Sequence, residues 1–287
     1  VEGAALNLGE AMTPITLNYT VNANSGASSG SSSGSSSSSA FAYANNKMDA
    51  GSHHTCAILD NGDLKCWGRG GAGQLGDGTQ MNANVNTPPS TAIDLGTGRT
   101  AVAVSAGNLH TCAILDDGSL KCWGQDSFGQ LGDGGSNTNT DAPSSTAIDL
   151  GTGRTAVAVS AGSGHTCAIL DNGDLKCWGL DTYHQLGDGF ANNNWNVNTN
   201  QPSSTPIDLG QGRTAVAVSA GNRHTCAILD NGDLKCWGAN NLGQLGDGST
   251  STKSAPSSTA IDLGTGRTAV AVVAGDFYTC AVLDNGE

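Results

Sequence analysis

The chain has 287 residues, a net charge of −13 and an isoelectric point near 4.6. With 42 Gly residues and only 5% aromatic residues, its composition favours turns and short strands over helices. The negative charge argues against a nucleic-acid-binding protein, and no apolar run is long enough to predict a transmembrane segment.

The first predicted element is a strand over residues 15–22. Four apolar residues alternate there with polar ones and would share one face of the strand: Ile15, Leu17, Tyr19 and Val21. Residues 25–40 form a Ser/Gly-rich tract, which is typical of a flexible linker. The strand can pair within its own chain, or it can be donated to a neighbouring subunit. We therefore divide the chain into a strand segment (1–24), a linker (25–40) and a repeat domain (41–287).

The repeat domain contains four complete copies of one sequence and part of a fifth. The segment His-Thr-Cys-Ala-Ile-Leu-Asp recurs, and the spacings between successive copies of its cysteine are 56, 55, 59 and 54 residues. All of this length variation falls in one loop per repeat, and each loop ends in proline: 79–88, 135–143, 190–202 and 249–256. In a repeat architecture such loops project from one face, which is often the binding face.

Each complete repeat contains two cysteines ten residues apart, on either side of an Asp-Asn-Gly or related turn. An antiparallel hairpin with this turn places the two cysteines directly opposite each other, which suits a disulfide. The expected pairs are Cys56–Cys66, Cys112–Cys122, Cys167–Cys177 and Cys226–Cys236. Zinc is the alternative, but the spacing departs from the usual zinc-binding motifs. Both faces of the hairpin are apolar, which predicts a sheet packed on both sides, as in a propeller or a β-solenoid.

Nine cysteines at a fixed spacing favour an oxidising compartment, so we expect an extracellular or cell-surface protein. We interpret the N-terminal Val as the result of signal removal, and Asn18 begins a candidate glycosylation sequon. Cys280 in the partial fifth repeat has no second cysteine after it in this sequence. We expect Cys280 to be unpaired or bonded to another chain.

At these motifs the sequence resembles the regulator of chromosome condensation repeat family, over residues 47–287. The motifs are Ala106-Gly107, His110-Thr111, Trp123-Gly124 and Gly129-Gln130-Leu131-Gly132, with equivalents in the other repeats. The resemblance implies a β-propeller, commonly of seven four-stranded blades, and the cysteine pair resembles exported microbial members. Members of the family include an exchange factor and a light sensor, so the fold implies no single activity.

Several repeated residues are candidates for chemistry, and we expect structural roles for them. One histidine recurs in each complete repeat, and such buried histidines usually form hydrogen bonds with the backbone. The alternative is a ring of metal ligands made of His54, His110, His165 and His224. Tyr278 replaces the histidine in the fifth repeat, which argues against a metal site. The repeated Trp residues indicate packing between blades. The repeated Arg residues are expected to bind carbonyls or Asp. The Asp-rich turns could bind calcium but lack a regular ligand spacing, so no cofactor is expected.

Two aromatic residues break the repeat pattern in the longest loop, Phe190 and Trp195, which are the binding candidates. We expect a non-catalytic, all-β extracellular structural or adhesive protein, in which the strand of residues 15–22 joins subunits into a filament. The alternative is a recognition module that binds a glycan or a cell-surface protein through the variable loops. No catalytic motif stands out from the repeats, so no enzyme is predicted.

Overall fold

The computed structural model describes residues 47–79, 84–190 and 198–287. Contacts divide the chain into two units, residues 1–40 and 41–287, and the described residues all belong to the second. The strand predicted at 15–22 and the linker lie outside the described residues. The described part contains strands and turns and no helix, as the composition predicts.

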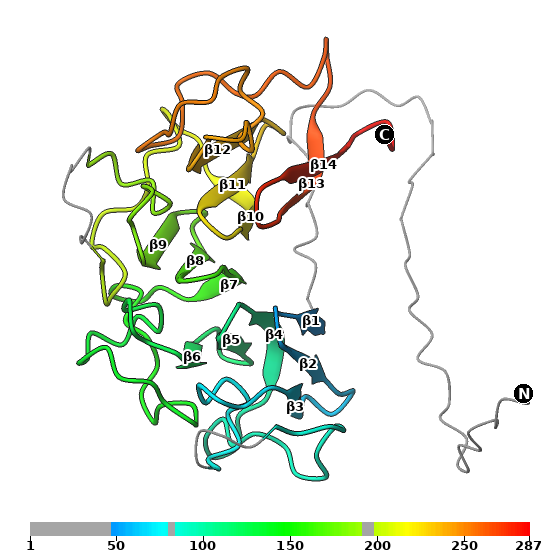
Figure 1. The fold of residues 1–287 in the computed structure, drawn as a ribbon, viewed down its shortest axis with the longest axis vertical. Coiled ribbons are helices and arrows are strands. Elements are labelled where there is room, and N and C mark those ends of the chain that lie inside the picture. Colours follow the sequence, from blue (N-terminus) through cyan, green and yellow to red (C-terminus); the bar gives the residue numbers. More distant parts are fainter. Residues whose placement is uncertain (1–46, 80–83, 191–197) are drawn as a thin grey trace, which may run out of the picture. The chain divides into compact units, whose positions relative to one another are not determined.

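Each complete repeat forms one three-stranded antiparallel sheet, and we call these sheets and the partial fifth one blades 1 to 5 (Figure 1). The strands are β1(Met48–Ala50), β2(His54–Ile58), β3(Leu64–Gly68), β4(Ala101–Ala106), β5(His110–Leu115), β6(Leu120–Gly124), β7(Ala156–Ala161), β8(His165–Leu170), β9(Leu175–Gly179), β10(Ala215–Ala220), β11(His224–Leu229), β12(Leu234–Gly238), β13(Ala269–Ala274) and β14(Thr279–Leu283). Within the described residues blade 5 contains only β13 and β14.

The second and third strands of each blade pair in the register that the cysteine spacing predicts. Cys56 lies opposite Cys66 and Thr55 opposite Trp67, and the same register recurs in blades 2, 3 and 4. All four expected cysteine pairs are bonded, with a Cα–Cα distance of 4.1 Å in each. A glycine at a positive φ, such as Gly62 at 84°, completes the turn between the two strands.

The family resemblance implies four strands per blade, and the structure differs on this point. The position of the fourth strand is reduced to a single bridge from the end of the third strand to the variable loop: Gly68–Val85, Gly124–Thr140, Gly179–Thr199 and Gly238–Lys253. These loops are rich in Asn, Thr and Ser and lack the apolar alternation that supports a longer strand. Within the described residues, the third strand is thus the last full strand of blades 1 to 4.

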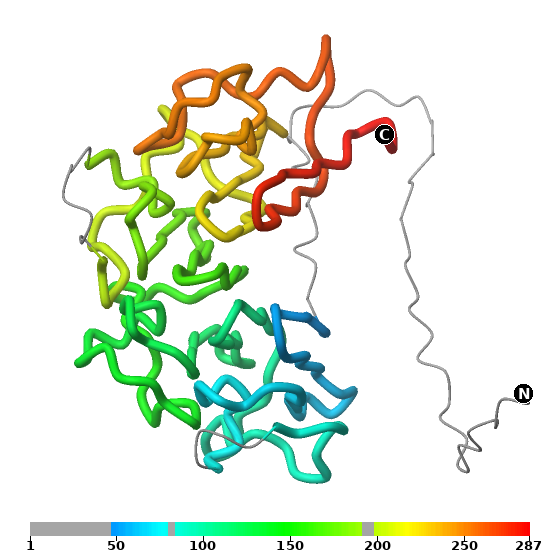
Figure 2. Tube along the Cα trace, in the orientation of Figure 1, coloured from blue at the N-terminus to red at the C-terminus, as the bar shows by residue number. Residues whose placement is uncertain are grey.

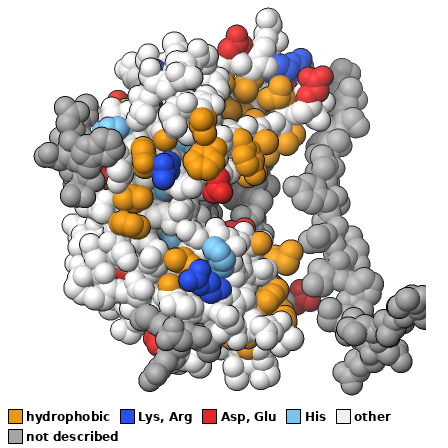
Figure 3. All heavy atoms as spheres, in the orientation of Figure 1, with side chains coloured by type: hydrophobic (Ala, Val, Ile, Leu, Met, Phe, Trp, Pro, Cys, Tyr) orange, Lys and Arg blue, Asp and Glu red, His pale blue; other side chains and the backbone are white. Residues whose placement is uncertain are grey.

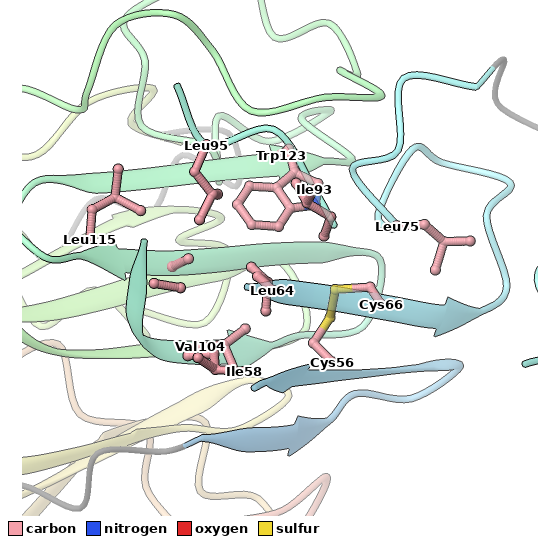
Figure 4. Packing of buried hydrophobic residues seen from close by; sticks show 12 residues of the cluster. Cys56, Ile58, Leu64, Cys66, Leu75, Ile93, Leu95, Val104, Leu115 and Trp123 are labelled. Atoms are coloured by element: carbon pink, nitrogen blue, oxygen red, sulfur yellow. A yellow bond between two sulfur atoms is a disulfide. The ribbon is translucent and has the colours of Figure 1, made fainter. Parts of the chain in front are cut away.

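Successive blades pack face to face in chain order, and Figure 2 shows the chain repeating the same path in each of them. At the first junction, the disulfide Cys56–Cys66, Ile58 and Leu64 of blade 1 pack with Leu115 and Trp123 of blade 2 (Figure 4). Three further clusters repeat this arrangement between the later blades. We call each such junction a seam, and the seams contain the hydrophobic core.

Candidate functional site

The two ends of each blade differ in how much their sequence varies between repeats. One end holds two segments: the turn between the first and second strands, and the start of the loop that follows the third strand. In blade 1 the backbone N–H of Arg69, in that loop, donates to the carbonyl of His53, in that turn. The bridge from Gly68 to Val85 brings the variable loop to this same end. We call this end of the blades the variable face.

The opposite end repeats almost without change, and we call it the constant face. There the Asp-Asn-Gly turn binds the start of the next repeat, through the bond from Ala101 N to Gly62 O in blade 1. An Arg–Asp ion pair recurs at this end: Arg99–Asp116, Arg154–Asp171, Arg213–Asp230 and Arg267–Asp284. The repeated arginines therefore bind Asp, one of the two partners expected from the sequence.

The variable face has a second set of variable residues besides the loops. Between the Ala-Gly and His-Thr motifs, each repeat carries a different pair: Ser52-His53, Asn108-Leu109, Ser163-Gly164, Asn222-Arg223 and Asp276-Phe277. In blades 3 and 4 the second residue of the pair lies at a seam, next to a loop residue of the preceding blade. Arg223 stacks on the ring of Tyr183 at 4.4 Å, and a Cβ on Gly164 would lie 3.1 Å from Phe128.

The first residues of these pairs line one cavity to which all five blades contribute. Its volume is about 310 Å³, and an Ala-Gly-x segment from every blade lines it, from Ala50-Gly51-Ser52 to Ala274-Gly275-Asp276. A backbone bond joins each such segment to the next, beginning with Ser52 N to Gly107 O and Asn108 N to Gly162 O. Equivalent positions of all the repeats therefore meet around this opening.

The repeated histidines join the blades together, but their partner differs from the expected backbone group. The Nε2 atom of His110 lies 2.9 Å from the hydroxyl of Thr166 in the next blade, and the other three repeat histidines make the same contact with Thr111, Thr225 and Thr279. Burial lowers the pKa of His110 and His165 to about 3 and of His54 and His224 to about 4. All four rings are therefore neutral at physiological pH.

Two buried aspartates lie beneath the variable face, in the loops that follow β6 and β9. Asp126 and Asp181 each accept a backbone bond within their loop, from Leu131 and Leu186. Burial is the main cause that raises the pKa of Asp126 to about 6 and of Asp181 to about 7. The variable loops are held against these segments by asparagine side chains, since Asn139 and Asn198 accept bonds from the amides of the two aspartates.

The binding residues predicted from the sequence are only partly placed. Phe190 is 63% exposed and lines a cavity of about 420 Å³ together with Leu186, Ile207 and Ala255. Trp195, like Asn18 and the apolar residues of the strand predicted at 15–22, lies outside the described residues. Among the described residues no three His, Cys, Asp or Glu side chains come together as a metal site, and no helix is long and apolar enough to span a bilayer.

The sequence alone did not lead us to the variable pairs between Ala-Gly and His-Thr, because we compared the repeats only by the lengths of their loops. The signal was present in the substitutions, since the pair between Ala-Gly and His-Thr is different in every repeat while its flanks repeat. The loop residues Phe128, Tyr183 and Leu242 occupy one repeat position and also vary in type. A comparison at each repeat position would have identified the variable face.

The sequence profile of the regulator of chromosome condensation (RCC1) repeat matches residues 61–114, 117–169, 172–228 and 231–282. A second profile of this repeat matches residues 46–74, 101–130, 156–185 and 215–244.

Among curated proteins, the ultraviolet-B receptor UVR8 of Arabidopsis thaliana is 31% identical over 72% of this chain and 44% of its own length. The mitochondrial RCC1 domain-containing protein RUG3 of the same plant is 28% identical over 83% of this chain and 51% of its own length. Human E3 ubiquitin-protein ligase HERC2 is 27% identical over 82% of this chain, but only 5% of the ligase is covered. The chain thus spans about half or less of the length of these relatives.

Solved structures show the same fold. Human WBSCR16 is 22% identical, with a TM-score of 0.69 over 82% of this chain and 56% of its own. Prp20p of Saccharomyces cerevisiae is 20% identical, with a TM-score of 0.66 over 82% of this chain and 54% of its own. Because the profile matches cover well over half of the sequence and the described blades have this fold, the chain belongs to the RCC1 repeat family.

Proposed function

We propose that this chain is a non-catalytic recognition module that binds a protein partner through the variable face. The observation that carries the proposal is the asymmetry between the two ends of the blades. Residues that differ between repeats gather at one end, around a cavity lined by all five blades, while the other end repeats the same Arg–Asp pairs. A surface that varies on an invariant scaffold is suited to recognising one particular ligand.

The chemistry of the variable face favours a protein ligand. Tyr183 and Arg223 stack there, and the neighbouring seam exposes Leu242 (63%) and Phe277 (47%). Aromatic residues and arginine contribute most to protein–protein contacts. The fold serves protein binding elsewhere, since yeast Prp20p has been characterised for its binding to Gsp1p and histones. The four disulfides support an oxidising compartment, and we propose an extracellular or cell-surface location.

The test is a screen of the chain against an array of extracellular proteins and a glycan array, with two matched variants. We expect Tyr183→Ala/Arg223→Ala to weaken capture by the selected protein at least tenfold. Arg154→Ala/Asp171→Ala, on the constant face, serves as the control and should bind normally. Equal binding by both variants would contradict the proposal. A glycan ligand that Phe190→Ala weakens would instead favour the variable loop as the binding site.

A second candidate is a structural subunit joined to its neighbours by strand exchange through residues 15–22. The alternation of apolar and polar residues in this segment favours it, because a strand with one apolar face can add to the sheet of a neighbouring subunit. This candidate predicts assemblies at high protein concentration that Leu17→Asp/Tyr19→Asp abolishes. A monomer under all conditions, measured by sedimentation, would exclude it.

A further inference from the structure

The loops that follow the third strands of blades 2, 3 and 4 differ at one buried position. That position holds Asp126 in blade 2, Asp181 in blade 3 and Asn240 in blade 4, which are 1%, 8% and 0% exposed. In all three side chains the Oδ1 atom accepts the backbone N–H of the leucine five residues later, at 2.9–3.0 Å. The three side chains therefore share one orientation, and the remaining terminal atom, Oδ2 or Nδ2, lies at the same position in each loop.

Blade 4 shows what surrounds this terminal atom. The Nδ2 group of Asn240 donates to Oδ1 of Asp247 and to the carbonyl of Ser249, both at 3.0 Å, and lies 3.2 Å from the Ser249 hydroxyl. The ammonium group of Lys253 lies 3.5 Å from Oδ2 of Asp247. In blade 4 the oxygens of this loop are thus matched by an amide donor and by a positive charge.

Blade 2 has neither the amide donor nor the positive charge. Asp126 replaces the amide by a second carboxylate beside Asp133, and Thr140 stands at the position of Lys253. The Oδ2 atom of Asp126 and the hydroxyl of Thr140 are both buried, and neither has a hydrogen-bond partner among the described residues. A buried oxygen therefore lies where blade 4 has a hydrogen-bond donor.

The two carboxylates of blade 2 are close enough to interact. Burial is the main cause of the raised pKa of Asp126, and the negative charge of Asp133 raises this pKa further. Within the described part of the chain, no Lys or Arg forms an ion pair with either carboxylate. Buried carboxylates are normally paired with a positive group or coordinate a metal ion. The structure of this loop therefore calls for a cation.

Blade 3 repeats the pattern of blade 2, and blade 1 does not. In blade 3 the charge of Asp188 adds to burial in raising the pKa of Asp181, and the hydroxyl of Thr199 is buried without a partner among the described residues. In blade 1 the buried position is Gly70, so Asp77 has no second carboxylate there. The pair of carboxylates thus occurs in blades 2 and 3.

We propose that blade 2 binds one calcium ion between Asp126 and Asp133, and that blade 3 binds a second ion in the same way. The ion occupies the position of the amide group in blade 4. The carbonyl of Gly135 stands at the position of the Ser249 carbonyl and, besides one bond from Asn200, has a second lone pair for the ion. Asp133 is exposed, so water can complete the roughly six to eight oxygen ligands that calcium takes.

The ligand chemistry selects calcium among the common metal ions. The ligands of each ion are oxygens, whereas zinc prefers the nitrogen and sulfur of His and Cys. Two carboxylates with neutral oxygens suit a weak site, with a Kd of about 0.1–1 mM, as in extracellular modules. On the face that Figure 3 shows, acidic side chains lie scattered, so a cation is concentrated by the carboxylate pair and not by a broad acidic surface. This inference is independent of ligand binding at the variable face.

The experiment counts the calcium ions bound to the chain of 287 residues by equilibrium dialysis. CaCl2 is raised to about 5 mM, well above the expected Kd, at about pH 8, where both buried aspartates are ionised. We expect two ions per chain, one ion after Asp126→Asn or Asp181→Asn, and none after both changes, because the new amide takes the position of the ion. The control is Asp60→Asn, an exposed residue of the constant face, which should still bind two ions.

A second variant tests whether this set of residues is sufficient. Asn240→Asp/Lys253→Thr gives blade 4 the residues of blade 2, and we expect it to bind a third ion. Thermal unfolding checks that each variant is folded. Calcium should raise the Tm of the unmodified chain, since an ion that binds only the folded state stabilises it, and should leave the Tm of Asp126→Asn/Asp181→Asn unchanged.

Unchanged calcium binding by Asp126→Asn/Asp181→Asn would overturn the proposal, as would the absence of bound calcium at about 5 mM. The two carboxylates of each loop would then be joined by a shared proton. A folded Asn240→Asp/Lys253→Thr variant that binds only two ions would overturn the proposed ligand set as well. None of these results would affect recognition at the variable face, which is tested separately by Tyr183→Ala/Arg223→Ala.

Discussion

At the residue scale, the threonine in blades 2 to 5 determines which ring nitrogen carries the hydrogen in the histidine of the blade before it. The hydroxyl of Thr166 donates to the carbonyl of Gln130 at 2.8 Å, so its oxygen must accept the hydrogen on Nε2 of His110. The other ring nitrogen, Nδ1, is buried without a partner in all four histidines. A proton on Nδ1 would place a charge in an apolar seam, which explains why the pKa of each ring is low.

This arrangement predicts a loss of stability in acid. The unfolded chain takes up protons below pH 6.5, whereas the folded histidines resist protonation down to about pH 3–4. Each histidine thus lowers the free energy of unfolding by roughly 2 kcal/mol at pH 5. The raised pKa of Asp126 and of Asp181 opposes this trend over the same range, but two groups do not offset four. We expect the urea midpoint to fall steadily from pH 7 to pH 5.

The control compares His165→Gln with a substitution at the exposed His53. His165→Gln should be less stable at pH 7 but should show a shallower dependence on pH, because one titrating ring has been removed. His53→Gln should follow the unmodified chain throughout. A midpoint that stays constant between pH 7 and pH 5 in the unmodified chain would contradict the prediction.

At the scale of the strand and turn, the glycines of the Gly-Gln-Leu-Gly motif separate backbone strain from packing. Gly132 and Gly246 have nearly the same φ, 73° and 69°, so alanine is strained equally at both. Only at Gly132 would the new Cβ overlap with a tryptophan, Trp178. We expect Gly132→Ala to cost about 1–3 kcal/mol more than Gly246→Ala, measured by urea unfolding. Equal costs would show that the close packing of Trp178 against Gly132 does not contribute to stability.

The hairpins were the most predictable elements, because three features of the sequence agreed on them. The Asp-Asn-Gly turn, the cysteine spacing and the apolar residues on both faces all require the same register, and the structure has it. The fourth strand could not be predicted correctly, since its position depends on contacts of a loop with no periodic pattern. The partner of the repeat histidines was also missed, because it belongs to the next blade and no local signal identifies it.

For the whole molecule, the same repetition that made the fold predictable limited what could be inferred about function. Every blade contributes an equivalent Ala-Gly-x segment to the cavity of the variable face, so the motif reveals the scaffold and not the ligand. Under the proposed function, specificity would lie in the few positions where the repeats differ, such as Arg223 and Phe277. The binding candidate drawn from loop length, Phe190, lies in a different cavity from these residues.

Because each blade packs mainly on its neighbours, stability should vary along the chain. Strands whose side chains are exposed open to solvent more readily than strands that neighbouring residues cover. In blade 5 the residues Val273 and Tyr278 are 60% and 59% exposed, whereas the equivalent Ser219 and His224 of blade 4 are mostly or fully buried. We expect amide hydrogens of β13 and β14 to exchange with solvent at least tenfold faster than those of β8 and β11, measured by mass spectrometry. Uniform protection across all five blades would show that the repeats unfold as one cooperative unit.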